Sequence, residues 1–133
     1  MHESILASAL TKRALPSLDG LGLAYNPLGD AGLAALLPAL RQLPLLKELG
    51  LINTNIGDEG VASLVAQPTA GALKSLEQLD LQYNQVTDAG CATFASALRG
   101  GALPALKELK LDHNPAGPQA TAEVQAALSA RSA

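Results

Sequence analysis

The stretch LKELGLINTNIGDEG (Leu46–Gly60) is one of four copies of a single segment in this chain. The other three copies are LDGLGLAYNPLGDAG (Leu18–Gly32), LEQLDLQYNQVTDAG (Leu76–Gly90) and LKELKLDHNPAGPQA (Leu106–Ala120). The copies are in register, because the second leucine of each LxL unit recurs after 28, 30 and 30 residues, as Leu23, Leu51, Leu81 and Leu111. A tandem repeat of this length predicts a solenoid in which each unit packs against the next.

The copies share the pattern LxxLxLxxNx(L/I/V), with Asn26, Thr54, Asn84 and Asn114 at the Asn position and Leu28, Ile56, Val86 and Ala116 at the last position. This pattern resembles the leucine-rich repeat, and the repeat length with its alanine-rich second half is similar to the ribonuclease-inhibitor-like subfamily. That subfamily includes the repeat regions of NOD-like receptors and of a Ran GTPase activator. The resemblance covers nearly the whole chain. It implies an α/β horseshoe, a solenoid with parallel strands on the concave face and helices on the convex face, and it implies proteins as partners. The chain departs from ribonuclease inhibitor, which is rich in cysteine, in having one cysteine.

The LxL alternation predicts a very short strand in each repeat, with both leucines pointing to one face. After the turn that follows each strand, the apolar spacing predicts an amphipathic helix. Strand, turn and helix repeating in this order predict parallel strands joined by right-handed crossovers. Helices are wider than the spacing between strands, so we expect the stack to bend.

The expected inward positions of the helices repeat as well. They are Leu33, Leu36 and Leu40; Val61 and Leu64; Cys91, Phe94 and Leu98; and Thr121, Val124 and Leu128. Because Cys91 occupies the column of Leu33, Val61 and Thr121, we interpret it as a small core residue rather than a nucleophile. In another column Gln125 replaces the apolar residues Leu37, Val65 and Ala95, as expected for a capping repeat with a polar outer side.

Polar residues recur at two further places in the repeat. Asp30, Asp58 and Asp88 share one offset, where we expect each carboxylate to act as a helix N-cap; a metal or acid site is the alternative. Pro118 takes this place in the fourth copy, which suits the first turn of a helix. The Asn at each turn is expected to bridge backbone groups of adjacent turns. Thr54 lacks part of this capacity, so we expect a local softening there.

The repeats predict one domain over residues 1–133, with the helix of a partial repeat at 1–17 and four strand–helix repeats beginning near 18, 46, 76 and 106. The partial repeat follows from the match between LASALTKRALPSL (Leu6–Leu18) and FASALRGGALPAL (Phe94–Leu106). The first strand then has no neighbour on one side, and a bare parallel edge is a pairing hazard. The chain is therefore either a piece of a longer array or uses that edge, for example in self-association.

Composition excludes several classes of function. A hydrophobic fraction of 48% with 16% charged residues is enough for a packed core. A formal charge of −3 and a pI of about 5.2 argue against nucleic acid as a partner. No stretch approaches the roughly 20 apolar residues of a membrane helix, and no Cys and His residues have zinc-ligand spacing; we expect no cofactor. A single cysteine allows no internal disulfide, so we expect a cytoplasmic protein.

The side chains between the framework leucines are expected to face out on the concave side in four columns. The columns are Gly20, Glu48, Gln78 and Glu108; Gly22, Gly50, Asp80 and Lys110; Ala24, Ile52, Gln82 and Asp112; and Tyr25, Asn53, Tyr83 and His113. Such variety on a fixed framework is typical of a binding surface, although solvated strand positions look the same. We predict that a protein partner contacts Tyr25, Ile52, Asn53, Asp80, Gln82, Tyr83, Lys110, Asp112 and His113. Asp80 and Lys110 are expected to pair, an interaction of about 0 to 1 kcal/mol.

The sequence predicts no catalysis. The histidines are His2 and His113, and no serine lies at the level of His113 to form a nucleophile–base pair. The alternative function is that of a GTPase-activating protein of the leucine-rich-repeat type, acting through the turns after the strands. Those turns contain no Arg or Lys and cannot supply an arginine finger, which leaves only an asparagine-based activator open; they are 26–31, 54–59, 84–89 and 114–119. A third hypothesis is that the module merely extends or caps a larger protein.

Overall fold

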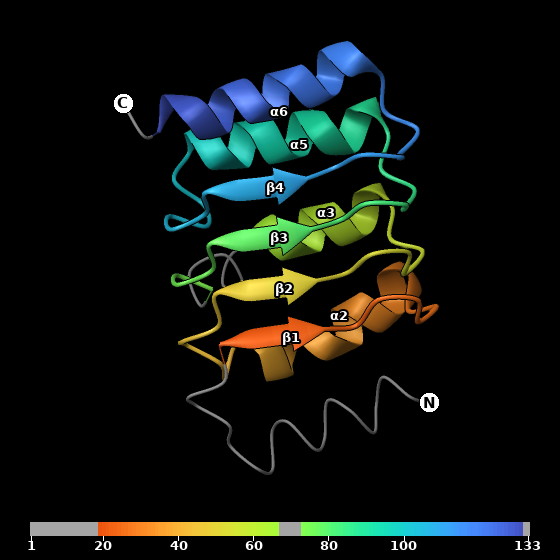
Figure 1. Ribbon diagram of the computed structural model, residues 1–133, viewed down its shortest axis with the longest axis vertical. Helices are drawn as coiled ribbons and strands as arrows, with labels where there is room; N and C mark the ends of the chain where they lie inside the picture. The colour runs from red at the N-terminus through yellow and green to blue at the C-terminus, as the bar shows by residue number, and fades with distance from the viewer. Residues whose placement is uncertain (1–18, 67–72, 132–133) are drawn as a thin grey trace.

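The first leucine of each LxL unit lies at the centre of a three-residue strand. The computed structural model describes residues 19–66 and 73–131, and its strands are β1 (Gly20–Gly22), β2 (Glu48–Gly50), β3 (Gln78–Asp80) and β4 (Glu108–Lys110). They form one parallel sheet in the order β1-β2-β3-β4 (Figure 1). Leu21, Leu49, Leu79 and Leu109 pair in register across it. The predicted parallel arrangement is therefore confirmed.

Within the described residues, four helices cover one face of this sheet, and none of them lies on the other face (Figure 1). They are α2 (Gly29–Leu40), α3 (Asp58–Val65), α5 (Asp88–Arg99) and α6 (Pro118–Ala130). Each packs on its neighbours in sequence, α2 on α3, α3 on α5 and α5 on α6. A helix is about 10 to 12 Å wide and strands are about 4.8 Å apart, which places the helices on the outer curve. The predicted α/β horseshoe is confirmed; the helix expected over 1–17, which includes His2, lies outside the described residues.

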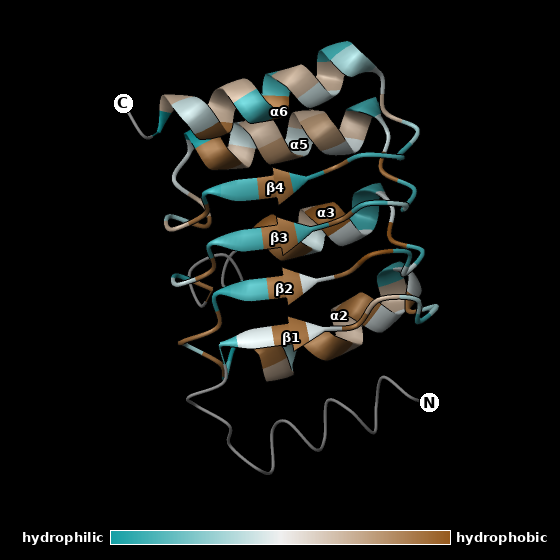
Figure 2. Cartoon of the chain, viewed as in Figure 1, coloured by the Kyte–Doolittle hydropathy of each residue, from teal (hydrophilic) through white to brown (hydrophobic). Residues whose placement is uncertain are grey.

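Leucine is the most frequent residue of the core between sheet and helices. Figure 2 shows each strand with a hydrophobic centre, and the inward leucines of α2, among them Leu33, Leu36 and Leu40, are fully buried. Phe94 and Cys91 are buried in α5, as the column of inward positions predicted. Thr121, expected at the inward position of α6, is only partly buried. The core is therefore a stack of aliphatic layers that ends at α6, where an inward position is only partly buried.

The Asn at the turn bridges adjacent repeats, as predicted. The Asn84 side-chain nitrogen donates to the carbonyl of Leu51 in the preceding repeat (2.8 Å), and its Oδ1 accepts from the backbone N–H of Ile56 (3.0 Å). Asn114 repeats the arrangement, with Nδ2 on the carbonyl of Leu81 (2.8 Å) and Oδ1 accepting from Val86 N–H (2.9 Å). Each such Asn pairs both its donor and its acceptor with buried or partly buried backbone groups of its neighbour.

Thr54 interrupts this ladder between the first two repeats. Its hydroxyl donates to the carbonyl of Leu51 within its own repeat (2.8 Å). The hydrogen bond to the first repeat is formed by the backbone, because Gly29 N–H donates to the Thr54 carbonyl (2.9 Å). Leu28 N–H, the counterpart of Ile56 N–H, donates within its own turn to the carbonyl of Asn26 (2.8 Å). One side-chain rung is therefore missing at Thr54, and the local softening expected there stays a prediction.

The recurring aspartates do not cap their own helices, and the N-cap prediction is wrong in this respect. Asp58 and Asp88 are the first residues of α3 and α5, and Asp30 is the second residue of α2. Each carboxylate accepts instead from the backbone N–H of the residue that precedes the next helix. The pairs are Asp30 with Gly57 (2.7 Å), Asp58 with Thr87 (2.8 Å) and Asp88 with Gly117 (2.8 Å). Each aspartate thus joins its repeat to the amino terminus of the following helix, which also favours a negative charge.

The last helix presents a polar residue at the end of the stack. Gln125 is exposed, whereas Leu37, Val65 and Ala95 in the same column are buried. Its side-chain nitrogen donates to the carbonyl of Leu109 in β4 (2.7 Å). Pro118 begins α6, as its place in the repeat predicted. A side chain of α6 therefore satisfies an acceptor at the outer edge of the sheet.

Candidate functional site

The open face of the sheet carries the predicted columns in the predicted register. Glu48, Gln78 and Glu108 are consecutive partners across β2, β3 and β4. Gly50, Asp80 and Lys110 are partners two residues further along the same strands. We call this open face, with the residues that follow each strand as far as Tyr25, Asn53, Tyr83 and His113, the concave face.

The fourth column has an unusual backbone conformation in every repeat. Tyr25, Asn53, Tyr83 and His113 have φ values of 63°, 53°, 58° and 63°, in the left-handed region. Three of these residues donate their backbone N–H to a carbonyl of the next repeat. The pairs are Tyr25 with Ile52 (2.9 Å), Asn53 with Gln82 (3.0 Å) and Tyr83 with Asp112 (3.0 Å). The repeat therefore imposes this turn whatever the side chain, at a cost of roughly 1 to 2 kcal/mol for a residue with a Cβ.

Two members of this column stack on each other. The rings of Tyr83 and His113 lie with centroids 4.2 Å apart and an interplanar angle of 8°. Tyr83 is 52% exposed, and Tyr25 at the other end of the column is 72% exposed. Sequence reasoning placed both rings in one column but did not predict their contact. The available signal was the identical offset of Tyr83 and His113 in consecutive repeats.

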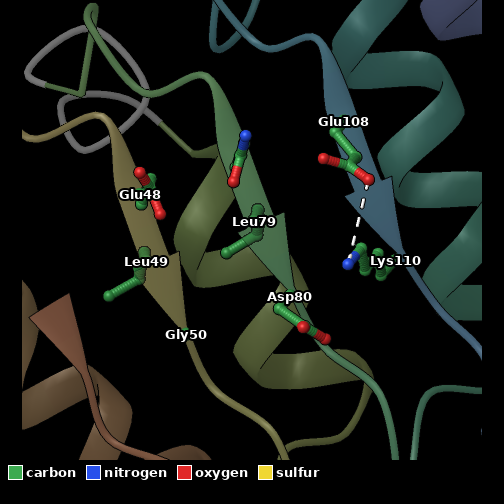
Figure 3. A pocket seen from close by; sticks show the side chains of 8 residues that line it. Glu48, Leu49, Gly50, Leu79, Asp80, Glu108 and Lys110 are labelled. Carbon is green, nitrogen blue, oxygen red and sulfur yellow. Dashed lines mark ion pairs between the residues drawn. The ribbon is translucent and has the colours of Figure 1, made fainter. Parts of the chain in front are cut away.

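A hollow of about 150 Å³ lies in the middle of the concave face (Figure 3). Its lining residues are Glu48, Leu49, Gly50, Gln78, Leu79, Asp80, Glu108 and Lys110. The expected pair between Asp80 and Lys110 is not formed. The ammonium of Lys110 lies 3.9 Å from Oε2 of Glu108 on its own strand, and Asp80 accepts instead from the side-chain nitrogen of Gln82 (2.9 Å). Residues two apart along an extended chain lie on the same face of the sheet. Lys110 therefore has Glu108, and Asp80 has Gln82, as a nearby partner, and the ion pair between the two strands is absent.

The remaining predicted contact residues differ in exposure. Asn53, Lys110, Asp112 and His113 are exposed, while Ile52, Asp80 and Gln82 are partly buried. At the β1 end the face is bare: apart from the adjoining residues, no atom of the described part of the chain lies within 4 Å of the position that a Cβ would take at Gly20 or Gly22. The concave face therefore changes from exposed backbone at β1 to charged and aromatic side chains at β3 and β4.

Cys91, the candidate nucleophile, lies apart from this face. Cys91 is buried in α5, and burial, followed by the nearby carboxylates of Asp88 and Asp58, raises the pKa of its thiol above the ordinary value of 9.0. Thiolate, the nucleophilic form, is therefore disfavoured. Within residues 19–66 and 73–131, no three His, Cys, Asp or Glu side chains come close enough to hold a metal ion, and no helix there is long and apolar enough to cross a membrane.

Comparisons with known proteins agree with this geometry. A family model described as Leucine Rich repeat matches residues 16–37, 42–65 and 72–95, a little more than half of the chain. Among solved structures, the leiomodin-1 actin-binding site 2 superposes with a TM-score of 0.71 at 19% identity, over 91% of this chain and 69% of that one. The tropomodulin C-terminal domain of Caenorhabditis elegans superposes with a TM-score of 0.62 at 16% identity, over 95% of this chain and 93% of that one. No curated protein matches the sequence. At these identities the two structures support the fold alone.

Proposed function

Because this chain belongs to the leucine-rich repeat family, we propose that it is a non-catalytic protein interaction module whose partner binds the concave face. The column of Tyr25, Asn53, Tyr83 and His113 is the observation that carries this proposal. Asn is among the few residues that visit the left-handed region routinely, whereas a tyrosine has no conformational advantage there. The tyrosines at this position therefore need another explanation.

Packing does not explain Tyr25, because 72% of the residue is exposed. Tyr83 packs one ring face against His113 but keeps half of its surface in solvent. Exposed tyrosines combine a large apolar area with a hydroxyl and few rotatable bonds, and they are enriched at interaction hot spots. The cost of placing them in a left-handed turn is consistent with selection for contact with a partner.

The concave face is small for a stable complex. Four strands at about 4.8 Å spacing and about 17 Å of length offer on the order of 320 Å² in projection, whereas a standard interface needs about 800 Å² per partner. We therefore propose that this single domain works as part of a larger array, or that loops add to the contact. The repeat length and the helix of 8 to 13 residues in each repeat support assignment to the ribonuclease-inhibitor-like subfamily, and with it a cytoplasmic location.

A comparison of variants in a pull-down tests the proposal. The double variant Tyr25→Ala/Tyr83→Ala alters the concave face, and Glu59→Ala/Gln119→Ala changes exposed residues of α3 and α6 as a matched control. We expect a protein retained by the wild type to be lost with the first variant and kept with the second. Equal retention by both variants would reject binding through the concave face. Actin is a suitable first purified probe, because the leiomodin-1 structure is named for an actin-binding site.

GTPase activation is the competing function. No described residue favours it, since the turns after the strands carry no Arg or Lys. Single-turnover GTP hydrolysis with a panel of small GTPases separates the two hypotheses. We expect no acceleration by this chain, and acceleration of any member of the panel would contradict the non-catalytic proposal.

A further inference from the structure

The hollow on the concave face combines a floor of bare strand backbone with a charged rim. Gly50 has no side chain, and the side chains of Leu49 and Leu79 are buried in the core on the other side of the sheet, so the hollow meets only their backbone. The carboxylates of Glu48 and Glu108 stand on either side, and Asp80 stands at one end (Figure 3). A ligand that fits here needs a slender part over the floor, where no side chain stands, and a cationic group level with the rim.

The charge on the rim is not balanced within the chain. Three carboxylates, on Glu48, Asp80 and Glu108, face one ammonium, on Lys110. That ammonium lies 3.9 Å from Glu108, and no ion pair to Glu48 or Asp80 is found among the described residues. The position of Lys110 shows that a basic side chain fits in the hollow beside Glu108. Room for a second cation remains on the side of Glu48 and Asp80.

The spacing of the carboxylates distinguishes between cations. Glu48 and Glu108 are two strands apart, which is about 10 Å between their backbones. The described residues offer no group of three ligands that could hold a metal ion, so a small inorganic cation is not suited to this rim. A guanidinium is planar, carries five donors, and can reach carboxylates on more than one side. Its three-methylene stem is slender and can lie over the bare backbone at Gly50.

We propose that the hollow is the recognition pocket for an arginine side chain of the protein partner. The guanidinium lies between Glu48 and Asp80, with its stem over the backbone of β2 and β3, and the partner main chain crosses the strands of the concave face. This assignment rests on the proposed function and specifies the partner: a segment with an exposed arginine. Tyr25 and Tyr83, which follow β1 and β3 on the same face, are additional contacts.

NMR titration of the full chain with short peptides tests this assignment. The probes are Ac-Ser-Thr-Arg-Thr-Ser-NH2 and the same peptide with Lys, Gln or Glu at the centre. We expect the arginine peptide to shift the amide signals of Glu48, Gly50, Gln78 and Asp80 at millimolar concentrations, the lysine peptide to bind more weakly, and the Gln and Glu peptides to cause no shift there. Raising the salt from about 0.05 to about 0.3 M is expected to weaken the arginine peptide severalfold.

Matched variants separate the pocket from general attraction to an acidic surface. Glu48→Gln is expected to weaken the arginine peptide about threefold, whereas Glu59→Gln on α3, with the same charge change, leaves it unchanged. Lys110→Gln removes the competing ammonium and is expected to tighten binding about twofold, more than Lys107→Gln outside the hollow. Equal effects within each pair, or shifts spread over the helices, would overturn the assignment.

The pocket and the proposed function fail in different ways. If a partner is lost with Tyr25→Ala/Tyr83→Ala but is insensitive to Glu48→Gln and to salt, the concave face binds protein and the arginine pocket is wrong. If the arginine peptide binds at the hollow but partner retention survives the tyrosine variant, the pocket stands and the proposed function is wrong. A lysine or Gln peptide that binds as tightly as the arginine peptide also rejects the arginine assignment.

Discussion

Asp58 and Thr87, in consecutive repeats, are joined by two hydrogen bonds. Oδ1 of Asp58 accepts from the backbone N–H of Thr87 at 2.8 Å, and Oδ2 accepts from its hydroxyl at 2.6 Å. The same hydroxyl accepts from the N–H of Ala89 and so caps α5 (3.2 Å). Gly90 makes room for the carboxylate, since a Cβ there would lie 2.3 Å from Oδ1. The aspartate, the cap residue and the glycine therefore work together as one joint between repeats.

Removing this carboxylate is expected to weaken the joint between α3 and α5. Asp58→Ala eliminates both bonds to Thr87, and we expect a loss of about 1 to 2 kcal/mol in the free energy of unfolding, measured by urea denaturation. The neighbouring Glu59→Ala is the control, with an expected change within about 0.5 kcal/mol. A similar loss in both variants would show that the effect arises from the helix end and not from the joint.

Thr54→Asn is expected to supply the missing rung of the Asn ladder. By analogy with Asn84, the new amide would donate to the carbonyl of Leu23 and accept from the N–H of Leu28, and we expect a gain of about 0.5 to 1 kcal/mol. Hydrogen exchange is the sharper measurement, because protection should rise at the N–H of Leu28 and stay constant in the last repeat. A loss of stability would mean that the shorter first repeat has no space for the longer side chain.

Gln125→Leu is expected to expose the outer edge of the sheet. The substitution leaves the Leu109 carbonyl without the donor that it has at 2.7 Å and adds apolar surface beside it. Unsatisfied edge groups template pairing with other chains. We expect concentration-dependent self-association of Gln125→Leu in analytical ultracentrifugation. The control Gln119→Leu, on the same helix, is expected to sediment like the wild type. If both variants associate equally, added hydrophobicity and not the edge is responsible.

Cys91 makes stability depend on pH in the alkaline range. Burial raises the pKa of its thiol above 9.0, so the folded protein holds a proton that the unfolded chain releases. The sign follows: the contribution to stability is complete below the unfolded pKa and is lost as the pH rises through the folded pKa. We expect the midpoint of urea unfolding to fall more steeply above about pH 9 in the wild type than in Cys91→Val. Identical slopes would show that the thiol is not the group responsible.

The repeat motif predicted most of the fold because its information is local and recurs. LxL alternation, the Asn at the turn and the apolar helical positions each specify a short element, and the 28- and 30-residue spacings align those elements into parallel strands with the observed register. The burial of Cys91 and the role of Asn84 follow from the same repetition. Each of these depends on geometry that any copy of the unit imposes on its neighbour.

The tertiary structure alone decided which polar groups meet. A sequence offset identifies Asp58 as equivalent to Asp30 but does not say whether its carboxylate reaches its own helix or the next one, about one strand spacing away. Lys110 had acidic neighbours along its own strand and across to the next, and the observed pair is with Glu108. The stack of Tyr83 on His113 depends likewise on side-chain rotation. The sequence by itself determined the solenoid, its register and its columns, because apolar burial tolerates ångström shifts. Hydrogen bonds, ion pairs and ring contacts do not, so their partners are set only when the repeats are packed together.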